Sequence, residues 1–441
     1  MVIARYLALV AVVLSMTVGF SATVAAEELA TRQSTGPPKQ ATGPPKLATT
    51  GPKPKPITPP TAEAIQTALD RGIDFLLADQ RTDGSWGSAE RTKDLNIYAP
   101  VPGAHHAFRS AVTALAVMAL VECEPTLEST RATKAAEAIE SAQAWLLSKA
   151  GKVRRADVDA LYNTWGHAYA LQGFVRLHQR AEGDQPLQAK LVKAAQAQAD
   201  LLDRYTFING GWGYYDFTVH TKVPGSSPNS FTTATGLVAL YEARELGVTY
   251  PEKKIARGVK SMLRQRYPDF SYAYGEYLRM NPRVDINRPA GSLGRSQACN
   301  LALRMFEEEV TGKTMVTDEV FKAWLNRLYA RNGWLSIGRK YPVPHEAPFG
   351  VAGYFYYYGH FYAGLTLELL PEADRPYFQD HLAHVLLPLQ EKDGSWWDFP
   401  FYNYHQQYGT AMALVSLRRC QHETSPQPEQ VAEKVVEGVE R

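Results

Sequence analysis

The chain has 441 residues, of which 45% are hydrophobic, 21% charged and 11% aromatic, a balance that excludes a wholly disordered protein. Its formal net charge of +2 excludes a general electrostatic affinity for nucleic acid, so no nucleic-acid partner is expected. The three cysteines, Cys123, Cys299 and Cys420, lie far apart, which excludes a disulfide framework and a CxxC-type zinc site. We therefore expect neither a metal nor another cofactor.

The N-terminal segment, residues 1–26, has one charge at Arg5, an apolar run from Tyr6 to Phe20 and then small residues. This order is typical of a secretory signal peptide and predicts an exported protein, whether periplasmic, secreted or tethered outside the cytoplasm. The uncharged stretch from Tyr6 to Ala26 is also long enough to cross a bilayer, so an uncleaved anchor remains the alternative.

Residues 27–60 contain repeats of Thr-Gly-Pro-Pro-Lys, at Thr35 and again at Thr42. Proline removes backbone donors and favours an extended, solvated chain, which predicts a disordered spacer. Its lysines leave open a position near a membrane or a cell wall. A folded body is expected over residues 61–420 and a polar tail over residues 421–441.

Tryptophans in glycine-rich turns divide the body at Trp86, Trp212, Trp334 and Trp396. The separations are 126, 122 and 62 residues, multiples of a period near 62, which predicts six repeats. Degenerate turns are expected at Lys149 to Gly151 and Phe270 to Gly275.

Each period contains two helical patterns. Amphipathic outer helices are predicted at Ala64 to Asp79, Arg131 to Lys149, Gln188 to Arg204, Glu252 to Arg266, Asp318 to Ala330 and Ala373 to Glu391. Inner helices rich in small and apolar residues are predicted at Ser110 to Val121, Thr164 to Leu177, Thr232 to Leu246, Ser296 to Phe306, Tyr356 to Leu370 and Tyr408 to Leu417. Twelve alternating helices predict an all-α fold, an (α/α)6 toroid.

Two of the turns, Gln80-x3-Gly84-x-Trp86 and Gln390-x3-Gly394-x-Trp396, match the QW repeat. On these motifs the chain resembles the squalene cyclase and protein prenyltransferase β-subunit superfamily over roughly residues 61–420. The resemblance implies a terpenoid cyclase-like toroid whose cavity binds, or cyclises, an apolar isoprenoid.

The cyclases of that superfamily protonate an alkene with an aspartate in a DxDDTA motif. The nearest segment here, Asp157-Val158-Asp159-Ala160, starts like the motif and then departs from it. The resemblance makes Asp157 and Asp159 candidates for a general acid, with helix capping as the structural alternative. The Asp-x-Cys zinc ligands of prenyltransferases are absent.

The first turns of the inner helices should line a common mouth, because long loops enter them from one end of the ring. The expected lining residues are Tyr162, Trp165, His167, Arg295, Tyr356, Tyr357 and His405. Aromatic faces suit both cations and sugar rings, so residue type alone leaves the ligand open.

Two alternatives to isoprenoid binding remain. In the first, a polysaccharide lyase or hydrolase acts on acidic glycans, with Tyr356 or Tyr357 and His360 as base and acid and Arg295 or Arg109 facing a uronate. In the second, the ring is a non-catalytic binding scaffold.

Overall fold

The computed structural model describes residues 43–93, 102–216, 223–225 and 227–422. The predicted signal peptide, residues 27–42 of the spacer and residues 423–441 of the polar tail lie outside these residues. The described residues form α-helices and short 3-10 turns, and their only extended pairing is four isolated bridges. The predicted all-α fold is confirmed.

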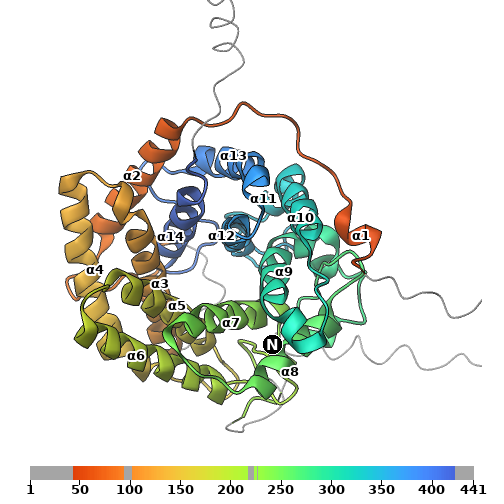
Figure 1. Ribbon diagram of the computed structural model, residues 1–441, viewed down its shortest axis with the longest axis horizontal. Coiled ribbons are helices and arrows are strands. Elements are labelled where there is room, and N and C mark those ends of the chain that lie inside the picture. The colour runs from red at the N-terminus through yellow and green to blue at the C-terminus, as the bar shows by residue number, and fades with distance from the viewer. Residues whose placement is uncertain (1–42, 94–101, 217–222, 226, 423–441) are drawn as a thin grey trace, which may run out of the picture. The chain divides into compact units, whose positions relative to one another are not determined.

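Six inner helices form the ring seen in Figure 1. They are α3 (Pro102–Cys123), α5 (Asn163–Arg180), α7 (Ser230–Ala243), α9 (Pro289–Thr311), α12 (Phe355–Leu367) and α14 (His405–Arg418). Each packs against the next, and α14 packs against α3, so the ring closes. Among the described residues one stretch, Gly103–Thr126, is apolar and long enough to cross a membrane, and 78% of its apolar window is buried inside this ring.

Six outer helices surround the inner ones. They are α2 (Ala62–Asp79), α4 (Ser129–Lys149), α6 (Gln185–Arg204), α8 (Glu252–Gln265), α10 (Asp318–Ala330) and α13 (Arg375–Leu386). The alternation of outer and inner helices along the chain is that of an (α/α)6 toroid, as predicted. A short helix, α11 (Asn332–Ser336), follows α10.

Small residues allow the inner helices to approach closely. A Cβ atom on Gly359 of α12 would lie 2.7 Å from the Cα of Gly294 in α9, closer than unbonded carbons can approach. A Cβ on Gly166 of α5 would lie 3.1 Å from the carbonyl of Ala107 in α3. The small residues in the sequence pattern are therefore contact points between inner helices.

The glycine-tryptophan turns at Trp86, Trp212 and Trp396 are structural: each one follows the end of an outer helix and packs against the next inner helix, and is here called a corner. The indole of Trp86 is fully buried and donates to the carbonyl of Leu76 in α2 over 2.8 Å, which satisfies a terminal carbonyl of the outer helix. Its backbone amide donates to the hydroxyl of Thr113 in α3 over 3.0 Å. The same pair of bonds recurs at the other two corners, from Trp212 to Leu202 and Thr233, and from Trp396 to Leu386 and Thr410.

The glutamines of the QW repeats join neighbouring outer helices. Gln80 donates to the carbonyls of Gly84 and of Ala138 in α4. Gln390 does the same with Gly394 and with Ala68 in α2, which contributes to closing the ring between its last and first repeats.

One predicted corner is wrong. Trp334 lies in α11 with 38% of its surface exposed. It contacts Arg331 at the end of α10, but its amide donates to the carbonyl of that residue and not to a threonine of an inner helix. The degenerate turn near residue 270 is a true corner, because Ser271 bonds to Asp269 as Ser85 bonds to Asp83. There Tyr272 takes the place of tryptophan and is fully buried.

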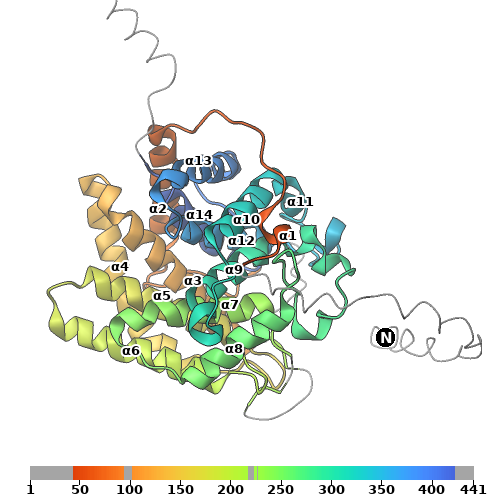
Figure 2. The same ribbon diagram turned by 45° about the vertical axis from the view of Figure 1, so that its right-hand side comes forward.

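The second half of the proline-rich segment is ordered, where a disordered spacer was expected. Residues 46–49 form the short helix α1 (Lys46–Thr49), which packs against α10. The guanidinium of Arg327 in α10 donates to the carbonyls of Leu47 and Thr50, and Ala48 is fully buried. From there the chain runs past α13 to α2 on the outside of the ring (Figures 1 and 2).

The C-terminal ends of the inner helices carry a network of ion pairs, here called the charged end. Glu122 of α3 pairs with Arg176 of α5 at 3.2 Å and with Arg419, which follows α14. Arg176 also pairs with Glu242 of α7. The pKa of Glu122 is lowered, because these two arginines outweigh the opposing effect of burial.

Candidate functional site

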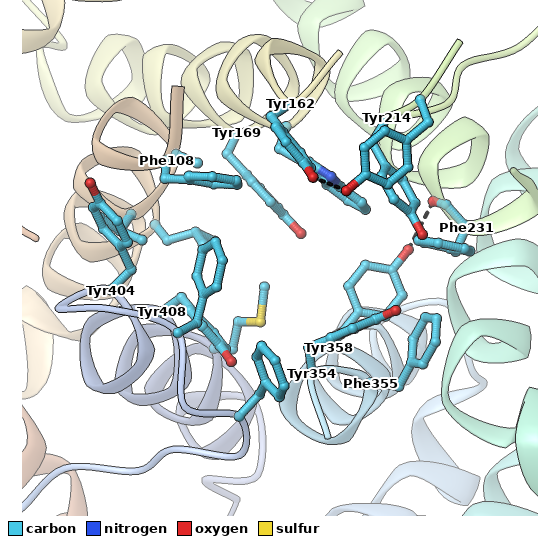
Figure 3. A pocket seen from close by; sticks show the side chains of 18 residues that line it. Phe108, Tyr162, Tyr169, Tyr214, Phe231, Tyr354, Phe355, Tyr358, Tyr404 and Tyr408 are labelled. Atoms are coloured by element: carbon cyan, nitrogen blue, oxygen red, sulfur yellow. Dashed lines mark hydrogen bonds between the residues drawn. The ribbon is translucent and has the colours of Figure 1, made fainter. Parts of the chain in front are cut away.

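An aromatic cavity of about 190 Å³ lies within the ring at the end where the inner helices begin (Figure 3). Its wall consists of Phe108, Ala111, Val112, Leu115, Tyr162, Trp165, Tyr169, Tyr214, Tyr215, Phe231, Tyr354, Phe355, Tyr358, Phe399, Phe401, Tyr404, Tyr408 and Met412. None of these described lining residues is charged. The wall of the cavity is therefore uncharged and mostly aromatic. Five of the six inner helices, and the loops that enter them, contribute residues to it.

The rings of the wall are arranged both face to face and edge to face. Trp165 stacks parallel to Tyr169 and to Phe231, with ring centroids 6.1 and 6.0 Å apart. Phe355 meets Phe231 edge-on at 5.0 Å. Such packing fixes the orientation of each ring, so the cavity is preformed.

Several tyrosine hydroxyls of the wall bond to other residues of the wall. Tyr358 donates to the carbonyl of Phe231 over 2.9 Å, and the hydroxyls of Tyr162 and Tyr215 bond to each other. Because these hydroxyls already have partners, the tyrosines offer a ligand chiefly their ring surfaces.

Two hydroxyls of the wall pair with histidines. The hydroxyl of Tyr354 lies 3.0 Å from Nε2 of His345, whose Nδ1 lies 2.9 Å from the carbonyl of Gly350. A carbonyl only accepts, so Nδ1 carries the proton and Nε2 accepts from Tyr354. Burial lowers the pKa of His345, which favours this neutral form. The second pair joins Tyr404 to His105 at 2.9 Å.

A carboxylate lies directly behind the wall. Asp398 is fully buried, and its Oδ1 accepts from the hydroxyl of Tyr408 over 2.5 Å while its Oδ2 accepts from the amide of Tyr357 over 2.9 Å. Burial raises the pKa of Asp398 to about 7, although these bonds and the more distant Arg339 act in the opposite direction.

A second hollow adjoins the cavity and shares Tyr214 and Tyr215 with it. This hollow, here called the groove, has a volume of about 770 Å³. The other described residues that line it are Tyr274, Tyr277, Asp285, Ile286, His345, Glu346, Ala347, Pro348, Phe349 and Gly350. Tyr277 and Phe349 are 59% and 40% exposed, so the groove presents aromatic surfaces to solvent.

The structure places only two of the seven predicted lining residues, Tyr162 and Trp165, on the cavity wall. His167 is buried against Gln198 of the outer helix α6, with Nδ1 and Oε1 2.8 Å apart. His405 is also buried, and its Nδ1 lies 2.6 Å from the carbonyl of Tyr402. Burial lowers the pKa of both histidines to about 4, so they are neutral.

The predicted tyrosine–histidine site on α12 faces away from the cavity. His360 and Tyr356 both bond to Asn332 of α11, over 2.9 Å each, and the adjacent Tyr357 is buried outside the lining. The error has a geometric cause, since Tyr356, Tyr357 and His360 do not share the helix face of Tyr354, Phe355 and Tyr358.

The predicted uronate-binding arginines have other roles. Arg295 is fully buried and donates to the carbonyls of Tyr272 and Gly291, over 3.0 and 2.7 Å. Its guanidinium therefore stabilises the backbone at these two residues. Arg109 binds Asp83 at the first corner. Neither arginine lines the cavity.

The two candidate acids also lie elsewhere. Asp157 is exposed and Asp159 is half-buried, and neither lines the cavity. The carboxylate of Asp157 accepts from the amide of Val158, a local loop bond. The structure therefore does not bring either aspartate to the cavity as a proton donor.

The sequence-based prediction missed most of the wall because it took every side chain in the first turn of each inner helix as a lining residue. The residues on one face of each helix would have been the better prediction. The spacing of Tyr162, Trp165 and Tyr169, and that of Tyr404, Tyr408 and Met412, is three or four residues and marks one side of α5 and of α14. Loop residues such as Tyr214 and Phe401 carry no comparable signal.

No protein-family model matches the chain, and no curated protein matches it in sequence. Its structure is similar to that of an inactive variant of the alpha-1,6-mannanase GH76A of Salegentibacter sp. HEL1_6, solved in complex with alpha-1,6-mannotriose. The TM-score is 0.51 at 11% sequence identity, and the match covers 81% of this chain and 99% of the mannanase chain. At this identity the likeness shows the shared toroid fold.

These findings correct the expected family. The expected membership of the squalene cyclase and prenyltransferase superfamily, and with it the expected isoprenoid ligand, is wrong, since no family model matches and the similar structure is a glycan-acting toroid. The physical reason is visible at the corners. The QW residues cap outer helices and join neighbouring repeats. They therefore indicate a ring of helical repeats and do not indicate a particular ligand or reaction.

Proposed function

We propose that this protein binds glycans outside the cytoplasm, and that the aromatic cavity holds a single saccharide ring. The observation that carries the proposal is the uncharged wall of fixed aromatic rings around about 190 Å³. An apolar cavity of about 150 Å³ holds a benzene ring, so this one has room for one six-membered ring. Stacking of aromatic faces on the apolar face of a pyranose would supply the affinity.

The groove supports the same proposal. It begins at Tyr214 and Tyr215 on the cavity wall and presents Tyr277 and Phe349 to solvent. A glycan chain could place one terminal ring in the cavity and stack further rings along this groove. The mannanase of similar fold was solved with a bound mannotriose, which is consistent with a glycan of several rings.

We propose binding rather than cleavage. Glycoside hydrolysis ordinarily uses two carboxyl groups that flank the scissile bond. Among the described residues no aspartate or glutamate lines the cavity, and Asp398 lies behind Tyr408. Export, which the N-terminal sequence predicts, would bring the ring to extracellular glycans.

Calorimetric titration with a panel of trisaccharides that includes alpha-1,6-mannotriose tests the proposal. Trp165→Ala removes a stacking surface and should weaken binding about tenfold. Ala111→Leu fills the cavity from α3 and should abolish binding, while Ala136→Leu, half-buried on outer helix α4, should not. Failure of the folded protein to bind any glycan, or unchanged binding by Ala111→Leu, would overturn the proposal.

A further inference from the structure

The described residues that line the aromatic cavity and the groove include no lysine or arginine, and one buried guanidinium, that of Arg295, lies behind the rings of Tyr274 and Phe355, 5.8 and 5.9 Å from their centroids. The described lining residues of the cavity include no histidine either. The groove that leads to it is lined by two acids, Asp285 and Glu346, and among its described residues by no lysine or arginine. Asp285 is paired with Arg288 at 3.3 Å, so Glu346 is the groove acid that acts on a ligand. His345, the one histidine of the groove, is neutral as described above. Every formal charge on the described walls of the cavity and groove is therefore negative.

Asp398 adds a buried acid to this arrangement. Its two oxygens accept from neutral donors, the hydroxyl of Tyr408 and the amide of Tyr357, and no ion pair of the described residues includes it. Tyr408 is itself part of the wall, so the carboxylate lies one ring away from the cavity. A buried carboxylate acts through a low dielectric and is weakly screened by salt.

The wall itself also favours positive charge. The face of an aromatic ring is the negative pole of its quadrupole, and a cation placed against several such faces is stabilised when water is excluded. Trp165, Tyr169 and Phe231 stack within one part of the cavity wall. The tyrosines that donate to Asp398 and to His345 are held in the same cage.

From these observations we infer that the cavity selects a ligand with a cationic nitrogen, which on a glycan is a protonated amino sugar. This inference rests on the proposed function and narrows its ligand class. A neutral sugar ring would gain stacking alone, whereas an amino sugar would also gain the attraction of the ring faces, of Asp398 and of Glu346 in the groove. A uronic acid would be repelled by the same groups.

The test compares oligosaccharides of equal length at pH 8, where Asp398 is ionised. The first is built from N,N,N-trimethylglucosamine, whose charge does not depend on pH, and the second from neutral N-acetylglucosamine. Tetramethylammonium serves as a probe of charge without a sugar ring. We expect the cationic oligosaccharide to bind at least tenfold more tightly than the neutral one by calorimetry.

Two variants locate the charge selectivity. Asp398→Asn should reduce the ratio of the two affinities at least threefold, whereas Asp380→Asn, which removes a carboxylate from outer helix α13, should leave the ratio unchanged. Glu346→Gln tests the groove independently of the buried acid and should lower the ratio by about twofold. Its matched control is Glu372→Gln, an exposed position between α12 and α13.

The outcomes separate the two ideas. Equal binding of both oligosaccharides, or a ratio that none of the cavity and groove variants changes, overturns the inference and leaves glycan binding standing. Binding of tetramethylammonium without binding of any saccharide overturns the proposed function and supports the cation preference of the cavity. Binding of none of the probes overturns both.

Discussion

The two ends of the ring are built by the same inner helices and differ in almost every physical respect. At the charged end, arginines and glutamates pair across α3, α5, α7 and α14 around a hollow of about 680 Å³. At the opposite end, uncharged rings surround a cavity of about 190 Å³. The charged side chains are largely occupied with one another, whereas the ring faces are directed into empty space. The two hollows therefore differ in the charge of their walls as well as in volume.

The largest effect should come from breaking the charged end. Glu122→Gln leaves Arg176 and Arg419 short of a shared, buried partner and should lower the free energy of unfolding by about 3 kcal/mol. Saccharide binding should stay within twofold, because the cavity lies at the other end. Urea unfolding measures the first quantity and calorimetry the second.

The control for this change is Glu245→Gln, which alters an exposed glutamate at the same end. It should change the free energy of unfolding by less than about 0.5 kcal/mol. If both variants unfolded alike, the network would not stabilise the ring.

A pH effect of intermediate size should come from Asp398. Burial raises its pKa to about 7 in the folded protein, so between about pH 4 and pH 7 the folded state keeps a proton that the unfolded chain has released. The stability that this group contributes is present below that window, falls as the pH rises through it, and levels off above pH 7. Between pH 5 and pH 8 the fall is on the order of 3 kcal/mol.

Asp398→Asn should remove this part of the pH dependence, and unfolding free energies measured at pH 5 and pH 8 would reveal it. Asp200→Asn, at an exposed position on outer helix α6 whose carboxylate accepts from Gln196, should keep the slope of the unaltered protein. Parallel pH curves for the unaltered protein and Asp398→Asn would contradict the assignment of the slope to this carboxyl.

The smallest effect should come from Tyr354→Phe at the aromatic end. The change leaves Nε2 of His345 without its donor and should cost about 1 kcal/mol of stability. The ring stays, so saccharide affinity should fall by no more than about threefold. Tyr341→Phe, at a 40% exposed tyrosine, provides the comparison. A loss of affinity above tenfold would mean that the hydroxyl itself contacts the ligand.

The fold could be predicted from the sequence because its signals are local and repeated. Helical periodicity placed all twelve ring helices, and Trp86, Trp212 and Trp396 marked true corners. The prediction of a corner at Trp334 was wrong because the sequence Asn-Gly-Trp there forms a short, partly exposed helix. Tyr272 filled a corner without a tryptophan, since the Asp-x-Ser turn before it makes the same local bonds.

The site was less predictable because it depends on which side of each helix faces inward. On α12, Tyr358 lines the cavity while Tyr356 and Tyr357, one or two residues earlier, do not. Asp398 could not be distinguished from other aspartates, since its burial results from the approach of Tyr357 and Tyr408. The family was misjudged because corner motifs stabilise the ring and do not specify a ligand.

The docking of α1 on α10 has a consequence for the closure of the ring. The first and last repeats are not consecutive in the chain, and the outer segment between α1 and α2 crosses the outside of the ring where they meet. Since α1 is held by Arg327 of α10, this segment ties α2 to the second half of the ring.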